Sequence, residues 1–201
     1  MYICVVNVTY MDGLSKKDQI TAAAGELFWK HGFRRISVAE ICTRAGVSRK
    51  TYYTYYNNKN ELILSMLTEL FESGLNKAKE IFDSEISFEE KIRKIMDFKI
   101  TIGKTWSKEF LTEMMQTPVI SEFYLQWAQK SLQLSRDFFA NAQKKGQVNP
   151  DLHIDFVMFT LQKYMDWIDD PAFMKYFDSV EDFIRQSTYL FLYGVMPVHK
   201  E

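Results

Sequence analysis

The sequence predicts an all-α fold of about nine helices, and three observations support this prediction. Apolar residues recur at intervals of three and four along most of the 201 residues, which is the spacing of one face of a helix. The chain contains only 8 Gly and 4 Pro, fewer than a chain with many short strands and turns needs. Apolar and polar residues do not alternate, as in a half-buried strand, outside the first ten positions.

The first predicted helix runs from Ser15 to Gly32. Its apolar side chains fall at i, i+3, i+4, i+7, i+8 and i+11, which places them on one stripe. The stripe consists of Ile20, Ala23, Ala24, Leu27, Phe28 and His31. Gly32 marks the end, because glycine readily adopts the backbone conformation that closes many helices.

Two short helices around a glycine turn are predicted next. Ser37 begins the first as its N-cap, and Glu40, three residues on, completes a capping box. Gly46 ends this helix, and Ser48 caps a third helix over about 49–56. Two such helices form a helix-turn-helix, whose second helix fits the major groove of DNA.

Six further helices are predicted in the remainder of the chain. They run over about 62–82, 88–106, 108–116, 119–145, 151–169 and 179–195. The breaks between them are indicated by polar runs and by Pro118, because proline favours a helix boundary.

Charge divides the chain unevenly. Residues 15–59 carry nine Lys and Arg against three acids, although the whole chain has a net charge of −1. A basic segment on an acidic remainder favours a polyanion-binding head. We therefore expect a tail over 1–14 that is disordered or weakly held, a DNA-binding domain over 15–60 and a second domain over 61–201.

Cysteine usage and hydropathy indicate the compartment. Cys4 and Cys42 are too few for a disulfide framework, so we expect free thiols in a reducing environment. No apolar run approaches the roughly 20 residues of a membrane span. The apolar start MYICVVNVTYM lacks the basic region and cleavage site of a signal peptide. The sequence therefore predicts a cytoplasmic protein with no membrane partner.

The residues that open the third helix suit base recognition. Arg49 and Lys50 can donate to guanine O6 and N7, and Thr51 can hydrogen-bond a base or contact a thymine methyl group. Tyr53 and Lys59 can reach phosphates, which supply affinity but little sequence information. A basic amphipathic helix is also common on solvated surfaces, and periodicity and charge alone leave that alternative open.

The order of residues in this region resembles a known family. The run SVAEICTRAGVSRKTYYTYYNNKNEL, preceded by AAGELFWKHGFRRISVAEI, resembles the N-terminal signature of the TetR family of bacterial transcriptional regulators. The matching residues are Gly32, Phe33, Ser37, Ile41, Ala45, Gly46, Val47, Ser48, Arg49, Thr51, Tyr53, Tyr56 and Lys59. The resemblance covers about 16–64, and beyond it only the helix count and the closing FLYGV are similar.

The resemblance implies a DNA-binding surface and a repressor that a small effector releases from an inverted-repeat operator. The residues assigned to DNA are Ser37, Ser48, Arg49, Lys50, Thr51, Tyr53, Thr54 and Lys59. Some positions depart from the family pattern: Lys50 stands where Gly is common, Tyr52 where Leu is, and Thr54 replaces a frequent Tyr. We expect these changes to alter the operator more than the fold.

The family also implies a C-terminal domain that dimerises, and the last two helices offer candidate faces. One stripe contains Ile154, Val157, Met158, Leu161, Met165 and Ile168, and the other Val180, Phe183, Ile184, Ser187, Leu190, Phe191 and Gly194. We expect a homodimer through these helices, because two-fold symmetry lets two heads read two half-sites. The alternative is that both stripes fill the core of one subunit.

Aromatic and Met residues gather in the middle of the chain, and such side chains suit a pocket for an apolar or aromatic effector. The candidates are Trp106, Phe110, Met114, Phe123, Trp127 and Tyr164. For any one of these residues, an ordinary place in the core is the simpler interpretation.

Two rival function classes remain. An all-α di-iron enzyme needs Glu-x-x-His pairs, and none of His31, His153 and His199 has Glu three residues before it. Asp151, His153 and Asp155 are better explained as the start of a helix than as metal ligands. We therefore expect no metal, no cofactor and no catalytic residue. A helical adaptor protein would leave the basic head unexplained.

Overall fold

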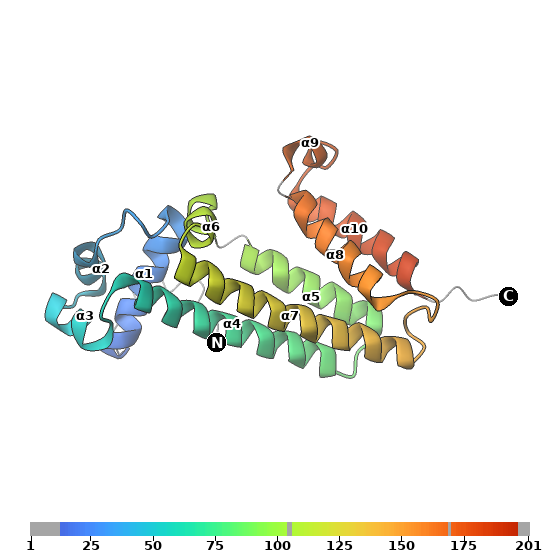
Figure 1. The fold of residues 1–201 in the computed structure, drawn as a ribbon, viewed down its shortest axis with the longest axis horizontal. Helices are drawn as coiled ribbons and strands as arrows, with labels where there is room; N and C mark the ends of the chain where they lie inside the picture. The colour runs from blue at the N-terminus through green and yellow to red at the C-terminus, as the bar shows by residue number, and fades with distance from the viewer. Residues whose placement is uncertain (1–12, 104–105, 169, 197–201) are drawn as a thin grey trace. The chain divides into compact units, whose positions relative to one another are not determined.

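Ten helices and no strand make up the part of the chain that the computed structural model describes, residues 13–103, 106–168 and 170–196 (Figure 1). They are α1 (Lys16–His31), α2 (Val38–Ala45), α3 (Arg49–Tyr55), α4 (Lys59–Asp83), α5 (Phe88–Gly103), α6 (Lys108–Met115), α7 (Pro118–Lys144), α8 (Ile154–Ile168), α9 (Pro171–Met174) and α10 (Val180–Val195). The all-α prediction is confirmed. The additional helix is α9, which is too short for periodicity to detect.

The described residues form two compact units. Unit 1 consists of those up to Gly74 together with 101–127, and unit 2 of 75–100 together with those from Ala128 onward. The long helices α4, α5 and α7 therefore each contribute to both units. The predicted division at residue 60 concerns which part reads DNA, and it stays a prediction. The expected tail and Cys4 lie outside the described residues, apart from Gly13 and Leu14.

The caps that the sequence predicts at the second and third helices are confirmed, and α1 has an additional N-cap that was not predicted. Ser15 Oγ accepts the N–H of Asp18 at 3.2 Å at the start of α1. Ser37 and Glu40 form the reciprocal capping box of α2. Gly46 has φ 63° and ψ 35°, the left-handed conformation, and the Val47 N–H donates to the Cys42 carbonyl at 3.0 Å. Local hydrogen bonding therefore sets the helix-turn-helix.

The core of unit 1 joins the helix-turn-helix to α1, α4 and α6. Its largest fully buried side chains include Phe28, Ile41, Tyr52, Leu62, Phe110 and Met114. Burial raises the pKa of Tyr52 to about 12, and its hydroxyl donates to the Asn58 carbonyl at 3.4 Å. Since α6 supplies Phe110 and Met114, this core depends on residues distant in sequence from the helix-turn-helix.

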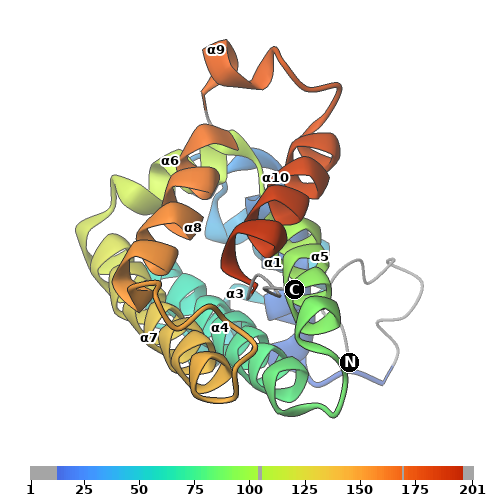
Figure 2. The same ribbon diagram turned by 90° about the vertical axis from the view of Figure 1, so that its right-hand side faces the viewer.

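The second unit has its own core, from α5, α7, α8 and α10, with α8 and α10 packed side by side (Figure 2). Val157, Met158, Phe183 and Phe191 of the two predicted dimer stripes are buried within this unit. The core interpretation therefore holds for these residues, against the prediction that they meet a second subunit. The most exposed apolar residues of α8 and α10 are Phe156, Phe159, Tyr189, Leu190 and Tyr193, each about 60–70 % exposed, and of these only Leu190 belongs to a predicted stripe.

No described helix combines the length and the apolar character required to cross a bilayer.

Candidate nucleic-acid interface

Helix α3 has a buried face and an exposed polar face. Tyr52 is fully buried, whereas Arg49, Lys50, Tyr53 and Thr54 are exposed. Tyr52 is the one buried side chain within the seven residues of α3, and it packs into the core of unit 1. Four of the predicted DNA-binding residues therefore lie together on one solvent-facing surface.

The first turn of α3 is ordered by Ser48 and carries no acid. Ser48 Oγ accepts the Thr51 N–H at 3.0 Å and lies 2.9 Å from Thr51 Oγ1, which fixes both side chains. Among the described residues, neither Arg49 nor Lys50 has an ion-pair or hydrogen-bond partner for its side chain. Arg44 differs, because its Nε donates to Glu26 Oε2 at 2.8 Å. Arg49 and Lys50 thus present uncompensated positive charge.

Ser37 has a structural role in this conformation. Its hydroxyl donates to Glu40 Oε2 at 2.7 Å and accepts the Glu40 N–H at 3.2 Å. The side-chain hydrogen bond from Ser37, followed by the backbone hydrogen bond from the same residue, lowers the pKa of Glu40. The predicted DNA contact of Ser37 would therefore require the capping box to share its hydroxyl group.

Lys59 has a role different from the predicted phosphate contact. Its Nζ donates to the carbonyls of Phe33, Arg34 and Ile36, at 2.5, 3.1 and 2.8 Å. An ammonium group has three N–H donors, and this turn between α1 and α2 uses all of them. Burial lowers the pKa of Lys59, although the carboxylate of Glu113 acts in the opposite direction. In the structure Lys59 therefore binds the backbone of residues 32–37, the α1–α2 turn, and has no N–H donor left for a phosphate. We call this set of three hydrogen bonds the backbone clamp.

The same turn binds a residue that the sequence analysis did not identify. Glu113 Oε2, from α6, accepts the N–H groups of Phe33 and Arg34 at 2.5 and 2.8 Å. Arg34 also donates from Nη1 to Gln116 Oε1 at 3.0 Å, just after α6. One acid on an amphipathic helix 80 residues away gives no local signal, so sequence patterns could not have found this contact.

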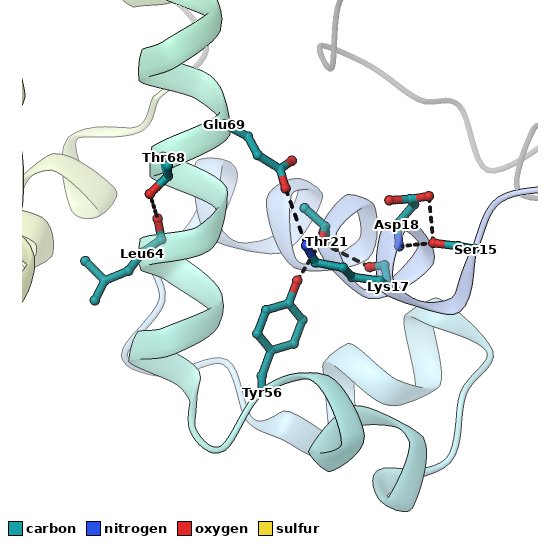
Figure 3. Close-up of polar contacts among 8 residues, drawn as sticks. All are labelled: Ser15, Lys17, Asp18, Thr21, Tyr56, Leu64, Thr68 and Glu69. Carbon is teal, nitrogen blue, oxygen red and sulfur yellow. Dashed lines mark hydrogen bonds and ion pairs between the residues drawn. The ribbon is translucent and has the colours of Figure 1, made fainter.

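Two further contacts join α1 to the residue after α3 and to α4 (Figure 3). The Tyr56 hydroxyl lies 3.1 Å from Thr21 Oγ1, which links the residue after α3 to the middle of α1. Lys17 Nζ lies 3.9 Å from Glu69 of α4. Both lysine and glutamate are about half exposed, so this ion pair contributes little, and the buried Tyr56 carries the attachment.

The predicted effector residues are distributed over both units. Phe110 and Met114 are 0 % and 1 % exposed in the core of unit 1, as the core interpretation expects. Trp106 and Phe123 pack against that core, and the Trp127 ring centroid lies 6.1 Å from that of Phe123. Tyr164 belongs to unit 2 and packs against its core, where burial raises its pKa.

A groove in unit 2 is lined by none of these candidates. It has a volume of about 590 Å³ and lies between α7 and α8. Its lining residues are Gln129, Leu132, Gln133, Arg136, Asp155, Met158, Phe159 and Gln162. Arg136 and Asp155 form an ion pair across it. The groove combines an apolar surface with amide and charged groups.

Comparison with known proteins identifies the helix-turn-helix region. The family described as "Bacterial regulatory proteins, tetR family" matches residues 20–66. The HTH-type transcriptional regulator TtgR of Pseudomonas putida is 36 % identical over 69 residues, which are 34 % of this chain and 33 % of TtgR. The match thus spans about a third of the length of that curated relative.

Solved structures resemble the chain over most of its length. A TetR transcription regulator from Haloarcula marismortui has a TM-score of 0.71 at 18 % identity, over 90 % of this chain and 98 % of that one. A transcriptional regulator from Saccharomonospora viridis, solved with choline, has a TM-score of 0.74 at 14 % identity, over 90 % and 98 %. At these identities the likeness concerns the fold. Residues 20–66 thus match the TetR family of bacterial regulatory proteins, and most of the chain has a fold similar to that of solved TetR regulators.

Proposed function

We propose that this protein is a transcriptional regulator that binds double-stranded DNA through α3. The observation that carries the proposal is the exposed set Arg49, Lys50, Tyr53 and Thr54 on a helix whose opposite face is anchored by Tyr52. Arg and Lys at the start of a recognition helix reach base edges, and Tyr and Thr hydroxyls can bind phosphate oxygens. Because its proposed target is chromosomal DNA, we infer that the protein works in the cytoplasm.

A homodimer through α8 and α10 would give this surface its specificity. One short recognition helix reads few bases, whereas a two-fold pair reads half-sites roughly 34–36 Å apart in an inverted repeat. The exposed Phe156 and Phe159 of α8, and Tyr189, Leu190 and Tyr193 of α10, supply an apolar surface of the kind that a second subunit covers. In the dimer proposal these residues replace the buried members of the predicted stripes, and Leu190 is kept from the original prediction.

A small effector would regulate DNA binding from unit 2. The groove between α7 and α8 offers Leu132, Met158 and Phe159 to an apolar moiety, and Gln129 and Gln133 to a polar one. An effector that binds the DNA-incompetent conformation more tightly releases the operator; tenfold release needs about 1.4 kcal/mol of coupling. Repression relieved by an amphipathic molecule is the mode of action that this arrangement supports.

Selection of duplexes from a random pool by the purified full-length protein tests the DNA-binding proposal. We expect an inverted repeat, and an affinity that falls steeply as salt rises. Arg49→Ala or Lys50→Ala should relax the preference at particular bases, with Thr43→Ala of α2, also exposed, as the matched control. A helical adaptor or an enzyme would show no salt-dependent duplex binding, and that result would exclude the proposal.

A further inference from the structure

A carboxylate from α6 holds the turn that orients the helix-turn-helix. We propose that Glu113 is a positioning residue for operator binding, so that the DNA-reading unit includes α6 as well as α1–α3. The inference rests on the proposed function. It extends the reading unit beyond residues 20–66, the segment that carries the family signature. The division of the fold supports this, because 101–127 belongs to the same compact unit as the helix-turn-helix.

The peptide group between Phe33 and Arg34 lies between two opposite charges. Its carbonyl accepts from Lys59 Nζ at 2.5 Å, and its N–H donates to Glu113 Oε2 at 2.8 Å. Hydrogen bonds to ionised groups are stronger than neutral ones, and here the peptide dipole aligns with both. Glu113 and Lys59 therefore act on the two ends of one peptide plane and fix its orientation.

The backbone conformation and the surroundings of Gly32 indicate that the turn accommodates the Glu113 carboxylate. Its φ is 73°, a conformation that other residues rarely adopt, and it follows the last residue of α1. A Cβ atom at this position would lie 2.7 Å from Glu113 Oε2. The carboxylate thus occupies the space that a side chain at position 32 would fill.

The rest of α6 is attached to the same end of α1. The Ser107 N–H, at the N-cap of α6, donates to the Trp29 carbonyl at 2.8 Å. Phe110 packs edge-to-face against Trp29, with ring centroids 4.6 Å apart. These contacts hold α6 to α1, while Glu113 binds the N–H groups of Phe33 and Arg34 in the turn that leads into Ser37, the N-cap of α2. A change at Glu113 therefore alters how α2 and α3 are presented relative to α1.

Electrostatic repulsion and positioning predict opposite changes in the affinity for DNA when Glu113 is replaced by an uncharged residue. Removing a negative charge lowers repulsion from DNA and should strengthen binding. Losing a positioning contact should weaken it. Glu109, also on α6 and exposed, provides the matched control, because it carries the same charge and, among the described residues, makes no hydrogen bond to the turn.

The test measures the affinity of the full-length protein for its selected operator and for an unrelated duplex, at one salt concentration. Glu113→Ala should weaken operator binding about tenfold, within the usual range of coupling between sites, without weakening binding to the unrelated duplex. Glu109→Ala should bind both as tightly as wild type or more tightly. Glu113→Gln keeps an acceptor oxygen and should recover part of the loss, which general destabilisation would not produce.

Equal operator affinities for Glu113→Ala and Glu109→Ala would overturn the inference and leave DNA binding intact. Failure of the wild type to bind any duplex at low salt would instead overturn the proposed function. Circular dichroism checks that each variant is folded at the assay temperature. If Glu113→Ala is unfolded at that temperature, the operator affinities of Glu113→Gln and Glu109→Gln are compared instead. Equal affinities of these two variants would overturn the inference.

Discussion

Replacing Lys59 by Met distinguishes the backbone clamp from the phosphate contact that the sequence suggested. The substitution keeps most of the apolar stem and removes three hydrogen bonds to carbonyls. Two of the bonds, to Phe33 and Ile36, are partly buried, and the bond to Arg34 is exposed. A hydrogen bond to a charged group contributes about 1.5–3 kcal/mol, and an exposed carbonyl regains water. We therefore expect the free energy of unfolding to fall by about 3 kcal/mol.

Thermal unfolding measures this loss, which corresponds to a fall in Tm of about 6–12 °C for a chain of this size. Lys50→Met is the control for stability, because Lys50 is exposed and has no partner among the described residues; its effect should stay within about 0.5 kcal/mol. The salt dependence of operator binding gives the second readout. Unchanged stability in Lys59→Met, together with a salt slope lower by about 1 per head, would refute the clamp and restore the phosphate role.

Further predictions concern the turns, the capping box and the dimer. Gly32→Ala should destabilise the protein more than Gly146→Ala in chemical denaturation. Both positions have φ 73°, so both substitutions incur about 1–3 kcal/mol of strain, but only a side chain at position 32 would also collide with a carboxylate. Because hydrogen bonds lower the folded-state pKa of Glu40, its stabilisation is present above pH 4.5 and is lost as pH falls through the folded pKa; Ser37→Ala should move the pKa back toward 4.5 in an NMR titration. Leu190→Glu, at a 65 % exposed position, should produce monomers in sedimentation velocity without unfolding the subunit, and an unchanged oligomer would contradict the proposed interface.

The helix-turn-helix was predictable because its signals are local. Ser37, Glu40, Gly46 and Ser48 each act within a few residues of their own position, so their spacing alone indicates where helices begin and end. The exposed side of α3 followed from the same spacing, once Tyr52 was placed inward.

Long-range contacts were not predictable in the same way. Lys59 lies at a position that suits a phosphate contact, and only the fold shows that three carbonyls of the α1–α2 turn surround its ammonium group. The buried members of the predicted dimer stripes were misplaced for a different reason. Helix α8 has apolar residues on two faces, with Val157 and Met158 buried and Phe156 and Phe159 exposed. Periodicity finds an apolar face, but it cannot choose between two of them.

The way the chain leaves unit 1 and returns to it matters for protein engineering. A chimera joined near residue 60 would combine the recognition helix of this protein with a foreign α6, although residues 101–127 belong to the same compact unit as that helix. A working graft would have to transplant two separate stretches, through Gly74 and from Thr101 to Trp127. If the proposed function is right, hybrid proteins that exchange only the N-terminal segment should therefore lose operator affinity, even when Arg49 and Lys50 have been carried across.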